Sequence, residues 1–367
     1  MSSAEDSVVA PGAISDHPLD ERVPAWTMPQ YPRINEWLDG AQRIWLPLHV
    51  SPDGDCLGSS LAFAKALKLR GFDCAVVSSD PIPDIYATLY NPDDVFIGAV
   101  PPGPPASHIA CLDISDPKRT GDFYTANEAT FRGETGVKVL NIDHHATNTQ
   151  FGDLQLLDTA APACAEQIAV ALNELEWPVN SEIARYILLG IVTDTLGFRT
   201  PATTVRTLRV AAHMMERGGN LQEIVDAVFN TRPLSAVMLW GKVLNSVKCA
   251  VDGRVIYVVV TPQMLDEAGA KEEDLEGLSS YLSTVRGDVK VAAVLKERED
   301  GTTRASLRSH PDTDVAAIAR HFGGGGHPQA AGATIPAVGN EAERLFLQAC
   351  ERGLDAETQN VKRDAAC

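Results

Sequence analysis

Short apolar runs alternate with amphipathic stretches over the first two thirds of the chain. Four runs are typical of buried strands: 43–50, 74–78, 108–113 and 138–143. Three stretches have apolar positions at helical spacing: 61–70, 163–175 and 183–198. Strands that alternate with helices of about ten to fifteen residues predict an α/β fold with a doubly wound, mostly parallel sheet.

The pattern changes after Arg232-Pro233. A helical stretch at 234–244 is followed by β-branched runs, a turn at Asp300-Gly301, and two further helical stretches at 314–322 and 341–350. This pattern predicts a second, smaller α/β domain that is hinged to the first, with a cleft between them. We expect an N-terminal tail at 1–30, a larger domain at 31–231, a linker helix at 232–245, a smaller domain at 246–352 and a C-terminal tail at 353–367.

Composition narrows the class of protein. The chain has 367 residues, 44% of them hydrophobic, which is enough for two domains with proper cores. No apolar run is long enough to span a bilayer, and no secretory signal pattern is present, so we expect a soluble, cytoplasmic protein without a membrane partner. Seven scattered cysteines without a C-x-x-C pair are typical of reduced thiols. The formal net charge of −18 disfavours long duplex nucleic acid but leaves a short anionic substrate open.

Carboxylates and imidazoles gather at the ends of four chain elements. They are His49, Asp53 and Asp55, then Asp113, then Asp143-His144-His145, and finally Asp194. Each group taken singly has a structural explanation as a turn or a helix cap. Strand ends of an open α/β sheet meet in one crevice, however, where four ionised aspartates would repel each other strongly. The set therefore predicts two divalent metal ions, with Mn²⁺ expected and Mg²⁺, Co²⁺ or Zn²⁺ as alternatives, in an arrangement suited to attack on phosphorus.

A glycine run, Gly323–Gly326, precedes His327 and Gly332. A flexible connector is one interpretation of such a run. The alternative is a tight turn whose backbone N–H groups face an anion. The sequence contains no G-x-x-x-x-G-K-[ST] motif, which excludes a P-loop.

Five ordered motifs resemble those of the DHH/DHHA1 phosphoesterases. They are L-H-V-S-P-D-G-D-C-L-G-S-S, L-D-I-S-D, N-I-D-H-H-A-T-N, G-I-V-T-D-T-L-G-F-R-T and G-G-G-G-H-P-Q-A-A-G, and they extend over nearly the whole chain after the tail. Within this superfamily, the chain is similar to the short-oligoribonucleotide hydrolases (nanoRNases) that also act as 3′-phosphoadenosine-5′-phosphate (pAp) phosphatases.

The resemblance implies roles for individual residues. One metal would be held by His49 and Asp53, the other by Asp55, His144 and Asp194, with Asp113 as the bridge. Asp143 would orient an imidazole, and His145 would contact the scissile phosphate or protonate the leaving oxygen. The substrate would be held by Arg308 and Ser306 and by the glycine loop with its histidine: Gly324, Gly325, Gly326 and His327. Arg199 is a further candidate cation near the cleft, and a solvated surface charge is the alternative.

The implied activity is metal-dependent hydrolysis of short oligoribonucleotides, including linear dinucleotides such as pApA, with pAp as a further candidate substrate. The resemblance also implies a possible homodimer through the larger domain. Three alternatives stay open: a phosphodiesterase acting on cyclic di-AMP or its linear product, a pyrophosphatase, and a non-catalytic nucleotide-binding protein. A processive RecJ-type exonuclease is disfavoured because the chain has no spare length for extra nucleic-acid-binding modules.

Overall fold

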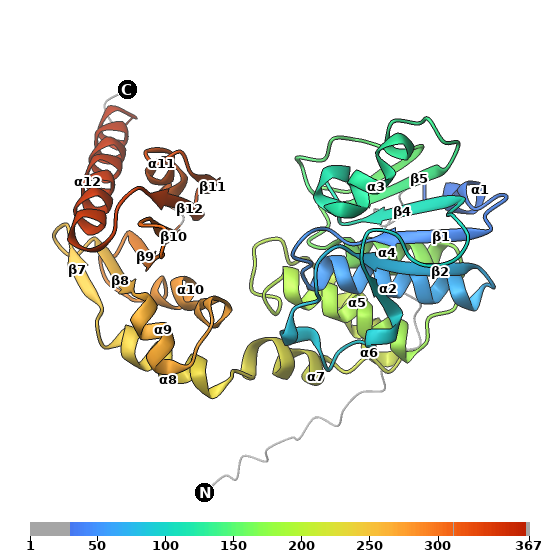
Figure 1. Cartoon of the computed structure of the whole chain (residues 1–367), viewed down its shortest axis with the longest axis horizontal. Helices are drawn as coiled ribbons and strands as arrows, with labels where there is room; N and C mark the ends of the chain where they lie inside the picture. The colour runs from blue at the N-terminus through green and yellow to red at the C-terminus, as the bar shows by residue number, and fades with distance from the viewer. Residues whose placement is uncertain (1–29, 311, 365–367) are drawn as a thin grey trace, which may run out of the picture. The chain divides into compact units, whose positions relative to one another are not determined.

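The structure is a computed structural model that describes residues 30–310 and 312–364. The chain divides into two compact units, Met1–Thr231 and Arg232–Cys367, and each is described by itself (Figure 1). The expected N-terminal tail lies, apart from Gln30, outside the described residues. Among the described helices, none has both the length and the apolar character needed to cross a membrane.

A six-stranded sheet forms the centre of the first unit, and all its strand pairs are parallel. The strand order is β3-β2-β1-β4-β5-β6. The strands are β1 (Arg43–Pro47), β2 (Asp73–Ser78), β3 (Val95–Ile97), β4 (His108–Leu112), β5 (Lys138–Asp143) and β6 (Leu154–Leu157). The strand order reverses between β1 and β4, so the sheet is doubly wound and confirms the predicted α/β class. Ligands of such folds bind beyond the carboxyl ends of the strands at this reversal.

Helices cover both faces of this sheet (Figure 1). They are α1 (Arg33–Trp37), α2 (Gly54–Leu69), α3 (Asp122–Phe131), α4 (Cys164–Glu174), α5 (Ser181–Asp194), α6 (Val205–Glu216) and α7 (Leu221–Val225). The larger core lies under α2, α4 and α5, and a smaller aromatic core with Trp45 and Phe123 lies under α3. Helices α2 and α5 cross at Gly58, where an added Cβ would lie 2.4 Å from the Tyr186 carbonyl oxygen. The absence of a side chain at position 58 therefore permits this close crossing.

Two positions of the first unit differ from the sequence prediction. We expected a helical stretch at 61–70, but α2 already begins at Gly54, because the Asp53 carboxylate caps it by accepting hydrogen bonds from the backbone N–H groups of Asp55 and Cys56. We expected a helical stretch at 183–198, but α5 ends at Asp194. The metal-site candidates Asp55 and Asp194 are therefore presented by helix ends rather than by loops or strands.

The second unit also contains a six-stranded sheet, in the order β11-β12-β10-β9-β8-β7. Its strands are β7 (Lys248–Ala250), β8 (Val255–Val260), β9 (Val291–Glu297), β10 (Thr303–Ser309), β11 (Gly325–His327) and β12 (Ala330–Ile335). All pairs are antiparallel except β8 and β9. One face packs under α11 (Val315–Arg320) and α12 (Gly339–Asp364), and the other under α8 (Leu234–Leu244), α9 (Pro262–Ala268) and α10 (Leu278–Leu282).

The glycine run and the C-terminus of the second unit depart from expectation. The run is not a flexible connector, because Gly325–His327 forms β11 and pairs with β12. A Cβ at Gly324 or Gly326 would lie 2.3 or 2.4 Å from a carbonyl oxygen of β12, so only glycine permits this pairing. We also expected a frayed tail from 353, but α12 continues to Asp364, since the sequence there is rich in good helix formers.

Candidate metal centre

The structure brings the six predicted metal ligands together at the point where the strand order of the first unit reverses. His49 follows β1, Asp113 follows β4, and His144 follows β5. The other three come from helix ends, Asp53 and Asp55 at the start of α2 and Asp194 at the end of α5. Side chains that are far apart in sequence therefore meet at one sheet edge.

Asp113 lies between the two histidines. Its Oδ2 is 3.7 Å from His49 Nε2, and its Oδ1 is 3.3 Å from His144 Nε2. His49 Nε2 also lies 3.5 Å from Asp53 Oδ2, while His144 Nε2 lies 3.4 Å from Asp194 Oδ2 and 3.8 Å from Asp55 Oδ2. The backbone of Asp113 has a φ of 60°, which is uncommon for a residue other than glycine and typical of functional sites. The distances define two adjacent groups of ligand atoms that share Asp113.

Both imidazoles are held by backbone carbonyl groups. His49 Nδ1 lies 2.9 Å from the Val50 carbonyl oxygen, and His144 Nδ1 lies 3.2 Å from that of Ala161. Because a carbonyl oxygen can only accept, each Nδ1 carries the hydrogen and each Nε2 faces the cluster. The two Nε2 atoms and Asp113 Oδ1 are buried and have no hydrogen-bond partner among the described residues. Buried polar atoms rarely lack partners, so this donor set fits bound metal ions.

The electrostatics of the cluster also call for positive charge. Burial, and then the negative charge of Asp113, raise the pKa of Asp194 to about 7 and raise that of Asp55 as well. Burial lowers the pKa of His144, but the adjacent carboxylates of Asp113 and Asp55 outweigh it and raise the pKa to about 10. Protons thus supply, in the metal-free protein, part of the charge that divalent cations would supply.

Asp55 is held by backbone N–H groups that we did not predict from the sequence. Its carboxylate is fully buried and accepts hydrogen bonds from Cys164 N, at 2.6 Å, and Ala165 N, at 2.9 Å, at the start of α4. The positive end of a helix dipole favours a carboxylate in this position. Gly190 leaves the space for it, because an added Cβ would lie 2.5 Å from Asp55 Oδ1. Gly190, which opens the G-I-V-T-D motif, is therefore the sequence feature that could have pointed to this close packing around Asp55.

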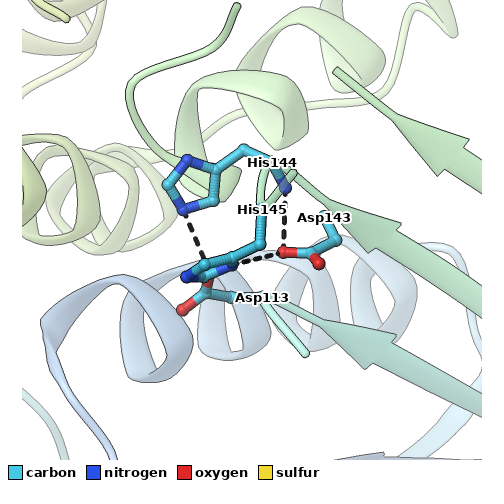
Figure 2. Close-up of side chains that lie close together, drawn as sticks. All are labelled: Asp113, Asp143, His144 and His145. Atoms are coloured by element: carbon cyan, nitrogen blue, oxygen red, sulfur yellow. Dashed lines mark hydrogen bonds and ion pairs between the residues drawn. The ribbon is translucent and has the colours of Figure 1, made fainter. Parts of the chain in front are cut away.

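Asp143 and His145 form a hydrogen-bonded pair beside the cluster, and His145 Nδ1 also lies 3.5 Å from Asp113 Oδ1. Figure 2 shows that the Asp143 carboxylate accepts from both the backbone N–H of His144 and the ring of His145; each distance is 2.8 Å. Its second oxygen accepts from Asn148 at 2.5 Å. Both Asp143 oxygens are thus occupied, which favours orientation of His145 over direct metal binding. Asn148, which closes the N-I-D-H-H-A-T-N motif, was not among the predicted site residues.

The predicted substrate-binding residues of the second unit lie in rows across its sheet. Arg308 pairs with Ala330 of β12, which in turn pairs with His327 of β11, and Ser306 aligns in the same way with Gly332 and Gly325. Directly paired residues of neighbouring strands share a face. Burial lowers the pKa of the Arg308 guanidinium.

Arg199 is exposed and lies in the first unit. Its guanidinium donates to the Leu196 carbonyl oxygen at 2.5 Å and lies over the Phe229 ring. These described contacts do not connect it to the carboxylate cluster.

The fold and the cluster together define a two-unit α/β protein with a candidate metal centre on the first unit. Two family models match the chain: the DHH family, N-terminal domain, over residues 43–191, and the DHHA1 domain over residues 252–354. The chain belongs to the DHH family, and this confirms the resemblance seen in its motifs.

Two relatives cover most of the chain. A bifunctional oligoribonuclease and PAP phosphatase NrnA from Thermus thermophilus is 35% identical over 328 residues, which are 87% of this chain and 90% of the relative. The protein of the same name from Bacillus subtilis is 29% identical, over 83% of this chain and 92% of the relative. The crystal structure of an exopolyphosphatase-related protein from Bacteroides fragilis has the same fold, with a TM-score of 0.80 and 23% identity over 90% of this chain and 98% of that one.

Proposed function

We propose that the protein is a metal-dependent phosphohydrolase that degrades short oligoribonucleotides, including linear dinucleotides, to mononucleotides, and that removes the 3′-phosphate of pAp. The observation that carries this proposal is the convergence on Asp113 of the buried His49 and His144 Nε2 atoms, which have no hydrogen-bond partner in the described part of the chain. The names of the relatives from Thermus thermophilus and Bacillus subtilis support the choice of substrates.

We infer which residues of the candidate metal centre would hold each of two cations. His49, Asp53 and Asp113 would hold one divalent cation, and Asp113, Asp55, His144 and Asp194 the other. Mn²⁺ suits such a mixed set of carboxylates and imidazoles, with Mg²⁺, Co²⁺ or Zn²⁺ as alternatives. When bound, a pair of cations screens phosphate charge and lowers the pKa of a water molecule.

His145 has the geometry of a proton donor to the leaving oxygen. Asp143 accepts from its Nδ1 at 2.8 Å, which leaves Nε2 for the substrate. The hydrogen bond that His145 donates to Asp143 raises the pKa of His145, so that a larger fraction of the imidazole carries the proton it would give up. The side chain is 37% exposed, unlike the buried Asp143, and is therefore accessible to substrate.

The substrate range of this proposal follows from charge. A formal net charge of −18 opposes a long polyanion, whereas a few local cations suffice for a short one. Arg308 and Ser306 line one hollow of the second unit, and we assign them to the nucleotide that is not hydrolysed. Gly324, Gly325, Gly326 and His327 lie on the neighbouring hairpin and would approach the same nucleotide.

The test is a substrate panel with the manganese-loaded, full-length protein. We expect turnover of pApA, of RNA of two to five nucleotides and of pAp, and a steep decline of kcat/KM with RNA length. Efficient digestion of a twenty-nucleotide RNA would refute the length limit. A higher kcat/KM for pyrophosphate or cyclic di-AMP than for short RNA would favour those rival activities, and no turnover with any divalent metal would favour a binding protein.

Two neighbouring histidines provide matched variants. His144→Ala should remove both bound metal and hydrolysis, because His144 faces Asp55, Asp113 and Asp194. His145→Gln should keep the metal and lose most of the hydrolysis, since the His145 ring hydrogen-bonds to Asp143 at 2.8 Å and approaches Asp113 only at 3.5 Å. Equal metal loss in the two variants, measured by elemental analysis after dialysis, would contradict this assignment.

A further inference from the structure

One face of the second unit's sheet carries three cations beside a hollow of about 260 Å³. Arg304, Ser306 and Arg308 alternate along β10 and so share this face, and Lys296 of β9 pairs directly with Arg304. The far wall is the short helix Glu272–Leu275 with the residues that follow it. Of these cations, only Arg308 has a role that the family resemblance implies.

Lys296 and Arg304 are like charges placed opposite each other on neighbouring strands. Such pairs are destabilising unless an anion lies between them. Lys296 is only 7% exposed, so its ammonium group also has little access to water. Glu272 pairs with it from a wall of the hollow, and the Glu272 side chain is 68% exposed. The two like charges therefore favour an anion at this point, and the Glu272 carboxylate is that anion. Because Glu272 is largely exposed to water, breaking its ion pair with Lys296 costs little free energy.

The two guanidinium groups keep donors free. Neither Arg304 nor Arg308 makes an ion pair with a carboxylate among the described residues; the one hydrogen bond that Arg308 makes there is to the Leu307 carbonyl oxygen. Arg304 is exposed and crosses the sheet over Gly332, where an added Cβ would lie 2.6 Å from Arg304 Nη2. The absence of a side chain at position 332 therefore leaves room for the Arg304 guanidinium over β12.

We propose that Lys296 and Arg304 form a second anion subsite, next to Arg308, which binds a terminal phosphate monoester of the nucleotide substrate, and that Glu272 occupies this subsite until the phosphate displaces it. The inference rests on the proposed function and deepens it. The Cα atoms of Arg304 and Arg308 are four residues apart on one strand, about 13 Å, so this face is long enough for two phosphate groups of one nucleotide chain. A dianionic phosphate competes well with a single exposed carboxylate for a buried ammonium group and a guanidinium fork.

The subsite predicts a preference for substrates with a 5′-phosphate. The ratio of kcat/KM for pApA to kcat/KM for ApA is measured with the manganese-loaded, full-length protein. Lys296→Met should lower this ratio about 10- to 100-fold, the loss expected for one charge-assisted hydrogen bond to phosphate. Glu272→Gln should raise the ratio several-fold, because the competing carboxylate is gone while its shape is kept. A ratio within twofold of wild type in both variants would overturn the proposal.

A second lysine–glutamate pair in the same unit provides the controls. Lys248 lies 2.6 Å from Glu343, away from the hollow, so Lys248→Met and Glu343→Gln should leave the ratio unchanged. A ratio that falls equally in Lys248→Met and Lys296→Met would also overturn the subsite. Should Lys296→Met fail to fold, Lys296→Arg should keep the preference, and Glu272→Gln tests the subsite independently.

Binding separates failure of the subsite from failure of the proposed function. Titration calorimetry with 5′-AMP and with adenosine needs no hydrolysis. If the wild-type protein cleaves neither dinucleotide, tighter binding of 5′-AMP than of adenosine, lost in Lys296→Met and strengthened in Glu272→Gln, would still support the subsite. Equal affinities of wild-type protein for 5′-AMP and adenosine would refute it.

Discussion

Gly190→Ala should test the packing that supports the metal centre while every predicted ligand is kept, because the substitution replaces no charged residue. An ideal Cβ at position 190 would lie 2.5 Å from Asp55 Oδ1 and 2.5 Å from Ala165 Cβ, whereas ordinary contact begins near 3.4 Å. In a close-packed interior, the helices or the carboxylate must therefore move by roughly 1 Å. Any such shift stretches the hydrogen bonds from Cys164 N and Ala165 N to Asp55.

The expected free-energy change has two parts of opposite sign. Overpacking of a core site costs about 1–3 kcal/mol, and replacing a helical glycine by alanine returns about 1 kcal/mol. We therefore expect the free energy of unfolding to fall by up to about 2 kcal/mol. The affinity for Mn²⁺ should fall about 10- to 100-fold, as for other losses of a partner that orients a metal ligand.

Gly241→Ala is the matched control, because it gives the same gain in helix propensity without a steric clash. Gly241 lies on the exposed part of α8 and has no neighbouring atom within 4 Å of an added Cβ. This variant should gain up to about 1 kcal/mol and keep the Mn²⁺ affinity of wild type. Urea unfolding followed by circular dichroism and calorimetric Mn²⁺ titration measure the two quantities. Wild-type Mn²⁺ affinity in Gly190→Ala would refute the role assigned to this close packing.

Three further predictions concern protons, a buried ion pair and the nucleotide site. Mn²⁺ binding at pH 7 should release protons, because the pKa of Asp194 is about 7 and that of His144 is about 10 in the metal-free protein. The affinity for Mn²⁺ should therefore rise with pH. Equal heats of Mn²⁺ binding in buffers of different ionisation enthalpy would contradict this proton release. Arg206→Met leaves the fully buried Glu166 unpaired and should cost about 3–5 kcal/mol in urea unfolding at pH 7. That loss should shrink as the pH is lowered, because burial already raises the pKa of Glu166 and a protonated carboxyl carries no charge; a loss that grows on acidification would count against it. Arg308→Ala should raise KM for dinucleotides far more than KM for a minimal phosphodiester, and equal effects on both would argue against a nucleotide contact.

The sequence predicted the parallel sheet and the meeting of its site residues because strand ends carry their chemistry in side chains. It did not reveal what holds Asp55. The donors are backbone N–H groups of Cys164 and Ala165, more than a hundred residues away along the chain, and an amide has no sequence signature. The hairpin of β11 and β12 was missed for a related reason. Glycine is rare in strands, and only the close approach of a second backbone makes it necessary there.

The hollow beside Lys296 could not be predicted from the sequence for a different reason. Lys296 and Arg304 are ordinary strand residues until the register of β9 and β10 places them opposite each other. The sequence predicted a hairpin turn between these strands but not which residues face each other across it. Register follows from turn geometry and from packing on both faces of the sheet, neither of which a single run of residues specifies.

The way in which the two metal-facing imidazoles are tethered bears on how this centre can evolve. His49 and His144 are oriented by the main-chain oxygens of Val50 and Ala161, which every amino acid possesses. Drift at positions 50 and 161 therefore leaves both rings in place. His145 depends instead on the Asp143 carboxylate, which Asn148 steadies. A single nucleotide change in the codon for Asp143 or Asn148 can therefore remove the hydrogen bond that orients His145, while His49 and His144 stay in place. Inactive descendants of this enzyme should accordingly still bind metal.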